Sequence, residues 1–147
     1  EVLPLLKGLI GDFSLSAQKK DLSISLFGDD AQIKGFPELI REMFFNLIDN
    51  AVKYTPDGGS IKLNVAKRDG IVQCVVSDTG IGIAQEHIPH VFERFYRVDK
   101  SHSRQTGGTG LGLAIVKHIA QIHKADLSLE STPQIGTTIT VSFAEQA

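Results

Sequence analysis

The sequence has few cysteines, no long apolar run and no excess of basic residues. It has one cysteine, Cys74, so an internal disulfide is excluded. No apolar run approaches the roughly 20 residues that a membrane-spanning helix needs. A net charge of −2 leaves no excess of basic residues, and we expect no nucleic-acid partner. The only methionine is Met43, and we expect the sequence to be a piece of a longer protein.

The length and composition predict one folded domain over residues 1–147. A chain of this size buries about two-thirds of its unfolded surface without disulfides or metals. Charged residues make up 22% and hydrophobic residues 41%, which is ordinary for a globular domain. Cys74 lies within an apolar, strand-like run, so we expect it in the core and not as a nucleophile.

Apolar periodicity predicts the order of helices and strands. Spacings of three and four residues predict helices, which are expected at 2–19, 38–54, 86–95 and 111–123. Alternation predicts strands, which are expected at 22–26, 61–65, 71–78, 127–131 and 137–143, with a short partner strand at 31–33. Asp69-Gly70 predicts a hairpin turn. The fold class is α/β, a two-layer sandwich in which three helices cover one face of a mixed, mostly antiparallel five-stranded sheet.

A long polar connection follows the third predicted strand. Residues 99–106 offer no apolar face for packing. Connections of this length without their own structure are usually functional or disordered. We therefore interpret residues 84–107 as a mobile lid.

Two glycine-rich motifs carry most of the information about function. The first, Asp78-Thr79-Gly80-Ile81-Gly82-Ile83, follows a predicted strand, and the second, Gly108-Thr109-Gly110-Leu111-Gly112-Leu113, opens a predicted helix. Glycines let backbone N–H groups approach a ligand, and a helix N-terminus favours an anion such as phosphate. The Asp78 carboxylate can accept a hydrogen bond from an exocyclic amine such as that of adenine. The alternative is that Asp78 only begins a turn after a strand.

A polar stripe runs along the predicted helix 38–54. It is formed by residues spaced four, four and three apart, namely Glu42, Asn46, Asn50 and Lys53. The stripe is either solvated or faces a polar site. In the second case an amide oxygen could coordinate Mg²⁺, which takes its other ligands from phosphates and water.

Five sequence blocks, in this order, resemble those of sensor histidine kinases. Residues 46–56 (NLIDNAVKYTP) resemble the asparagine box, 77–83 (SDTGIGI) the first glycine box, 91–99 (VFERFYRVD) the phenylalanine box, 108–116 (GTGLGLAIV) the second glycine box and 135–141 (IGTTITV) the closing strand. The resemblance implies the ATP-binding catalytic domain and its Bergerat-type fold, shared with type II topoisomerases, mismatch-repair ATPases and heat-shock chaperones. It also implies an entry helix at 1–20, an ATP lid at 84–107, and ATP with Mg²⁺ as cofactors.

The resemblance also implies a role for individual residues. Asn50, assisted by Asn46, would hold Mg²⁺, and Asp78 would bind the adenine amine with Thr137 or Thr138 nearby. Arg97 would reach the γ-phosphate and is the candidate catalytic residue. The remaining implied nucleotide contacts are Lys53, Tyr54, Gly80, Gly82, Ile83, Gly108, Thr109, Gly110, Leu111, Gly112 and Leu113.

One departure separates this chain from the ATP-hydrolysing members of the superfamily. Those relatives have a glutamate four residues before the magnesium asparagine, whereas this chain has Asn46, and an amide cannot act as a general base. The predicted lid, with Phe92, Phe95 and Arg97, likewise resembles that of kinases and not that of hydrolases. The open alternatives are a nucleotide-binding regulatory module without phosphotransfer and, less favoured, an ATP-hydrolysing clamp.

The five histidines lack the sequence context of the family's phosphorylated histidine. They are His87, His90, His102, His118 and His123, and the last two are expected on the surface. The phosphoacceptor would therefore lie on a dimerisation domain of the same protein, absent from this sequence, with a response regulator as an indirect partner. We expect the fragment to be a monomeric cytoplasmic domain of a homodimeric, membrane-anchored protein.

Overall fold

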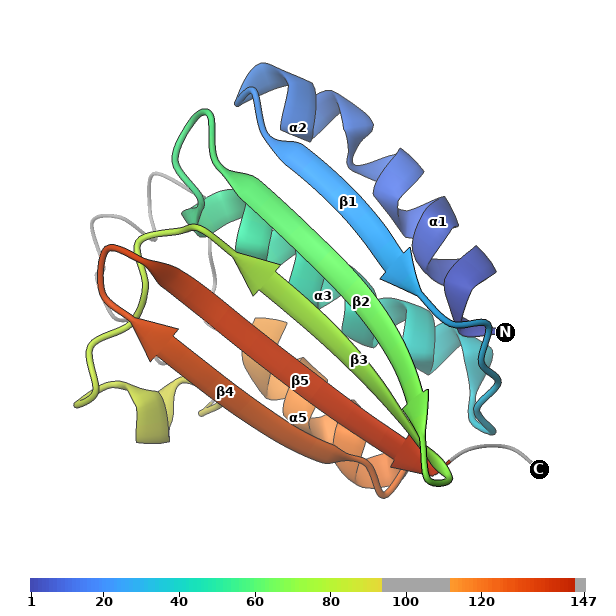
Figure 1. The fold of residues 1–147 in the computed structure, drawn as a ribbon. Helices are drawn as coiled ribbons and strands as arrows, with labels where there is room; N and C mark the ends of the chain where they lie inside the picture. Colours follow the sequence, from blue (N-terminus) through green and yellow to red (C-terminus); the bar gives the residue numbers. More distant parts are fainter. Residues whose placement is uncertain (94–111, 145–147) are drawn as a thin grey trace.

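The computed structural model describes residues 1–93 and 112–144. Its helices and strands are α1 (Val2–Asp12), α2 (Ser14–Lys19), β1 (Ser23–Gly28), α3 (Pro37–Tyr54), β2 (Ser60–Arg68), β3 (Ile71–Asp78), the 3₁₀ helix η1 (Ile88–His90), α5 (Gly112–Ile122), β4 (Asp126–Thr132) and β5 (Gly136–Ala144). Figure 1 shows α3 and α5 behind a twisted sheet, with α1 and α2 beside β1 at one edge.

The five strands form one sheet in the order β1-β2-β3-β5-β4. Only the β1–β2 pair is parallel, and the other three pairs are antiparallel. The mixed, mostly antiparallel five-stranded sheet predicted from the sequence is therefore confirmed. Asp69 and Gly70 both have positive φ, at 52° and 78°, as a two-residue hairpin turn between β2 and β3 requires.

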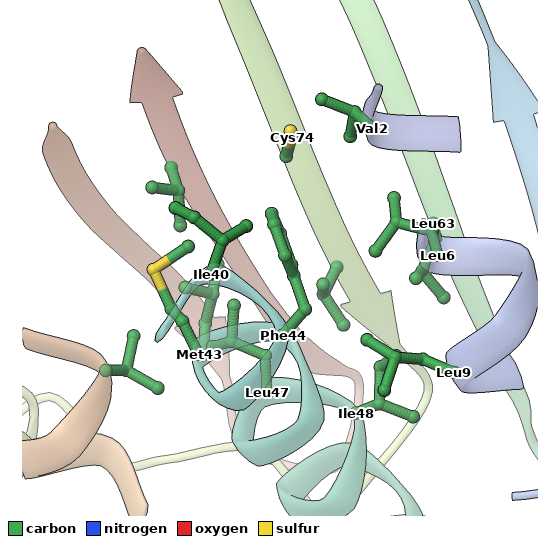
Figure 2. Close-up of a cluster of buried hydrophobic side chains, with 14 of the residues drawn as sticks. Val2, Leu6, Leu9, Ile40, Met43, Phe44, Leu47, Ile48, Leu63 and Cys74 are labelled. Carbon is green, nitrogen blue, oxygen red and sulfur yellow. The ribbon is translucent and has the colours of Figure 1, made fainter. Parts of the chain in front are cut away.

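One face of the sheet is apolar and covered by helices. Alternate residues of β2, β3 and β5 are buried, and their neighbours along each strand are partly or fully exposed. Figure 2 shows Phe44 and Ile48 of α3 meeting Leu6 and Leu9 of α1 in this core. Cys74 is 1% exposed, and burial raises the pKa of its thiol to about 12, so its predicted place in the core is confirmed.

Helix α3 forms where the sequence predicts it. Pro37 stands in its first turn, where its fixed φ and missing N–H suit a helix start. Glu38 lies near the N-terminus and Lys53 near the C-terminus, where the helix dipole favours their charges. Thr55 ends the helix immediately before Pro56, which disfavours helical backbone in the residue preceding it.

The predicted single helix at 2–19 is wrong, because the structure has two helices that meet at Phe13. The Phe13 backbone, at φ −96° and ψ 1°, lies outside the α-helical region. Its side chain is 5% exposed and stacks against Phe45 of α3, with ring centroids 5.0 Å apart. The apolar spacing continues through this break, so the sequence pattern does not reveal it.

The predicted strand at 31–33 is also wrong. The partner of β1 is β2, and residues 29–34 form no regular structure. Their hydrogen bonds go elsewhere: the Ala31 carbonyl accepts from the Val2 N–H at 3.0 Å, and Asp29 Oδ2 accepts from the Lys67 N–H at 3.2 Å.

The predicted α-helix at 86–95 is wrong over its described part, which consists of turns and the 3₁₀ helix η1. The backbone bonds span three residues, from His90 N–H to the His87 carbonyl and from Glu93 N–H to the His90 carbonyl. Pro89 has no N–H to offer a carbonyl four residues back, which disfavours continuous α-helix.

His118 is exposed as predicted, whereas His123 is only partly exposed. Its Nε2 accepts the Phe36 N–H at 3.0 Å, and its Nδ1 lies 2.8 Å from the Ile119 carbonyl oxygen. A carbonyl only accepts and a backbone N–H only donates, so the neutral imidazole carries its proton on Nδ1. His123 thus ties the end of α5 to the start of α3.

Replacing Phe44 by alanine should destabilise the domain far more than the same change at Phe45. Phe44 is 0% exposed, so truncation leaves a cavity and should cost about 3–5 kcal/mol. Phe45 is 43% exposed and should lose mainly its ring contact with Phe13, roughly 1 kcal/mol. Urea denaturation of both variants measures the difference, and equal losses would contradict the described orientation of α3.

Candidate nucleotide site

Asp78, the last residue of β3, presents a carboxylate that is held at one oxygen. Its Oδ1 accepts the Gly80 N–H at 2.8 Å and the Thr137 N–H at 3.3 Å. Within the described part of the chain, Oδ2 has no hydrogen-bond partner. Burial raises the pKa of Asp78, while the two backbone hydrogen bonds act in the opposite direction. The arrangement leaves one oriented oxygen to accept a hydrogen bond from a ligand.

The loop that follows Asp78 is bonded to three other parts of the chain. The Ile81 N–H donates to the Tyr54 carbonyl at the end of α3 at 3.1 Å, and the Ile81 carbonyl accepts the Gln134 N–H at 2.7 Å. The Thr79 N–H donates to the Ser60 carbonyl at 3.0 Å. The end of α3, the start of β2 and the β4–β5 turn therefore fix the first glycine motif.

The glycines of this motif are required by the packing of the protein itself. A Cβ on Gly80 would lie 2.6 Å from the Tyr54 carbonyl oxygen. Gly82 has φ +73°, and a Cβ there would overlap the Thr132 carbonyl. The sequence suggested that these glycines admit a ligand, whereas in the structure they let the loop close against α3 and β4.

The two asparagines of α3 differ in how they are held. Asn46 Nδ2 donates to the Glu42 carbonyl at 2.9 Å, and its Oδ1 lies 3.4 Å from the position a Cβ on Gly112 would take. Asn46 therefore adjoins the beginning of α5. The side-chain amide of Asn50, one turn later and half-buried, makes no hydrogen bond within the described residues and is available to a ligand there.

Lys53 forms an ion pair that the sequence analysis did not anticipate. Its Nζ lies 2.9 Å from Asp49 Oδ2, one helical turn back, and both side chains are about 30% exposed. Such a pair contributes little to stability, but it holds the ammonium close to α3.

The two candidate threonines of β5 lie on opposite faces of the sheet. Thr137 pairs with Asp78 and shares its face, and its hydroxyl lies 2.8 Å from the hydroxyl of Ser131. Thr138 pairs with Ser77 on the open face, where their hydroxyls lie 2.8 Å apart. The geometry therefore favours Thr137 over Thr138 beside Asp78.

Ser131 is a site residue that sequence reasoning missed. It lies in β4, is 8% exposed, and accepts the N–H of Ile83 at 2.8 Å. Its signal in the sequence is its place in an alternating strand, on the same face as Leu127 and Leu129 and opposite to Ser128. The bond appears only when the loop and the β4–β5 hairpin are brought together.

Several predicted site residues lie outside the described residues. These are Arg97 and the beginning of the second glycine motif, namely Gly108, Thr109, Gly110 and Leu111. Gly112 and Leu113 are described, and both lie in the first turn of α5. Most of the predicted lid, residues 94–107, is likewise outside the described part.

The described residues contain no cluster of three or more histidine, cysteine or acidic side chains able to hold a metal ion. A Mg²⁺ ion bound mainly by phosphates and water needs few protein ligands, and an available amide oxygen on Asn50 fits that requirement. None of the described helices is long and apolar enough to cross a membrane.

Comparison with known proteins identifies the family. The family model described as "Histidine kinase-, DNA gyrase B-, and HSP90-like ATPase" matches residues 35–147. The chain belongs to this family. The match includes the end of α3, both glycine motifs and the β4–β5 hairpin.

Individual relatives within the family are sensor kinases. The chain is 45% identical over 141 residues to the phosphate regulon sensor protein PhoR of Pseudomonas aeruginosa, covering 95% of this chain and 32% of that protein. It is 43% identical over 131 residues to the sensor histidine kinase YkoH of Bacillus subtilis, covering 89% of this chain and 28% of that protein. The chain therefore spans less than a third of either relative.

A solved structure of full-length ShkA in complex with AMPPNP has the same fold. It is 27% identical, with a TM-score of 0.85, and the match covers 100% of this chain and 31% of that one. The predicted two-layer α/β sandwich of a histidine kinase catalytic domain is thus confirmed.

Replacing Asp78 by asparagine should stabilise the ligand-free domain at neutral pH. Asparagine keeps an oxygen for the Gly80 and Thr137 N–H groups but removes the partly buried charge. Because the folded pKa is raised, the wild type binds protons more readily when folded than when unfolded. Its stability should therefore fall, relative to the variant, as pH rises through the folded pKa.

Urea denaturation of both proteins between pH 4 and 7 measures this difference, and other carboxyl groups cancel in the comparison. We expect the advantage of Asp78→Asn to be greatest at pH 7 and to shrink on acidification. A variant less stable than the wild type at pH 7 would contradict the assignment of Asp78 as a residue whose charge is costly to bury.

Proposed function

We propose that this chain is the ATP-binding catalytic domain of a sensor histidine kinase and donates the γ-phosphate to a histidine on a separate dimerisation domain. One observation carries the nucleotide assignment: Asp78 is bonded at one carboxylate oxygen and available at the other. The family match and the sensor kinase relatives support the same conclusion.

Asp78 Oδ2 would accept the exocyclic amine of adenine, a group that guanine replaces with a carbonyl acceptor. A base with a carbonyl there would place one hydrogen-bond acceptor against another, with no hydrogen between them. The binding free energy of such a base should be weaker by roughly 1–3 kcal/mol. The backbone bonds from Gly80 and Thr137 orient the carboxylate before the base arrives.

The phosphates would lie between the end of α3 and the start of α5. Asn50 would hold a magnesium ion, with the Asn46 amide next to it, and the bound ion would neutralise phosphate charge during transfer. Helix α5 begins beside Asn46, and the positive end of its dipole favours a phosphate there. Arg97 and Gly108–Leu111 lie outside the described residues, and their roles remain predictions.

Transfer to a protein histidine is favoured over ATP hydrolysis. The Asn46 amide is bonded to the Glu42 carbonyl and cannot take a proton from an attacking water. We propose that the phosphoacceptor lies elsewhere in a longer protein, since relatives extend well beyond this chain. A response regulator would then be an indirect partner.

Calorimetry with ATP and Mg²⁺ should show one molecule bound per chain, with affinity on the order of micromolar to sub-millimolar. Asn50→Ala should weaken binding mainly when Mg²⁺ is present, whereas Asn64→Ala, on the exposed side of β2, should change nothing. Addition of a dimerisation domain bearing its histidine should then yield labelled phosphohistidine from γ-labelled ATP.

The outcomes of this experiment separate the alternatives. Absence of ATP binding at millimolar concentration would contradict the proposal. Binding without transfer to any tested histidine domain would instead support a regulatory nucleotide-binding module. Steady phosphate release without a phosphorylated protein would indicate an ATP-hydrolysing clamp.

A further inference from the structure

The buried hydroxyl of Ser131 joins three segments around the candidate site. Ser131 Oγ lies 2.8 Å from the Ile83 N–H donor nitrogen, 3.0 Å from the Gly136 carbonyl oxygen and 2.8 Å from Thr137 Oγ1. The Ser131 carbonyl also accepts from Gln85 Nε2 at 3.3 Å. One serine thus connects the end of the first glycine motif to the beginning of β5.

These contacts determine the direction of each hydrogen bond. The Gly136 carbonyl can only accept, so it takes the single hydroxyl hydrogen of Ser131. The Ile83 N–H can only donate, so it uses a lone pair of Ser131. The hydrogen between the two hydroxyls must therefore come from Thr137, because Ser131 has none left.

This assignment determines whether the Thr137 hydroxyl can donate or accept a further hydrogen bond. With its hydrogen committed to Ser131, Thr137 Oγ1 has only lone pairs for any further partner. Thr137 is the strand partner of Asp78 and donates its backbone N–H to Asp78 Oδ1. The available Asp78 oxygen and the Thr137 hydroxyl oxygen are then both acceptors on the same face of the sheet.

We propose that Ser131 is a positioning residue for base selection: it holds Thr137 as an acceptor and so excludes bases that present a carbonyl to this edge. The inference rests on the proposed ATP-binding function and deepens it. Asp78 supplies one acceptor directly, and Ser131 prevents its neighbour from turning a donor toward the base. Without Ser131, the Thr137 hydroxyl could rotate and donate to a guanine carbonyl.

Ser131→Ala should reduce the preference for ATP over GTP by roughly fivefold or more, measured as the ratio of the two Kd values by calorimetry. Ser131→Thr retains a hydroxyl and should keep most of the preference for ATP over GTP. Ser128→Ala removes an exposed hydroxyl from the same strand and should leave the ratio unchanged. Thr137→Val should make a subsequent Ser131→Ala change ineffective, because no hydroxyl remains to be oriented.

A second readout needs no nucleotide. Amide hydrogen exchange at Ile83 should accelerate in Ser131→Ala and remain slow in Ser128→Ala, which tests the hydrogen bond itself. If the wild type prefers ATP and Ser131→Ala has the same ratio of ATP and GTP Kd values, this inference is overturned and the proposed function is not. A wild type that binds neither nucleotide would overturn the proposed function, and the inference with it.

Discussion

The carboxylate of Asp78 is the constraint on which the arrangement of the site depends. It lies at the end of a central strand, partly removed from water, and accepts two backbone N–H groups through one oxygen. Those bonds come from the loop that follows β3 and from the neighbouring strand β5, so the carboxylate joins the two segments that flank it. The bond to Gly80 is one that an ordinary turn aspartate also makes, whereas the cross-strand bond from Thr137 goes beyond a turn. Within the described residues, the second carboxylate oxygen of Asp78 has no hydrogen-bond partner.

The surrounding residues hold Asp78 and the loop after it in place through packing and through hydrogen bonds that are individually weak. Gly80 and Gly82 let the loop approach backbone carbonyls that a side chain would displace. Ser131 and the Tyr54 carbonyl bind the loop's N–H groups, which would otherwise be buried without partners. A partly buried charge lowers the stability of the free domain, and under the proposed function the amine of a bound ligand would offset this cost.

Much of the fold could be predicted from the sequence, because apolar periodicity is strong in α3, β2, β3 and β5. The errors came from single residues or from tertiary hydrogen bonds: Phe13 leaves the helix to pack on Phe45, and Ala31 bonds to Val2 instead of to a strand. For the site, the motifs indicated Asp78 and Asn50. They did not indicate Ser131 or choose Thr137 over Thr138, since the contacts of these residues depend on the register of β3, β4 and β5.

The central claim is that Asp78 recognises an exocyclic amine, and the most direct test removes that amine. Calorimetry would compare ATP with purine riboside triphosphate, which has hydrogen in place of the amine, on the wild type and on Asp78→Asn. The account predicts that loss of the amine costs the wild type roughly 1–3 kcal/mol and costs the variant much less. Equal losses in both proteins would show that the amine and the carboxylate do not interact, and would contradict the account.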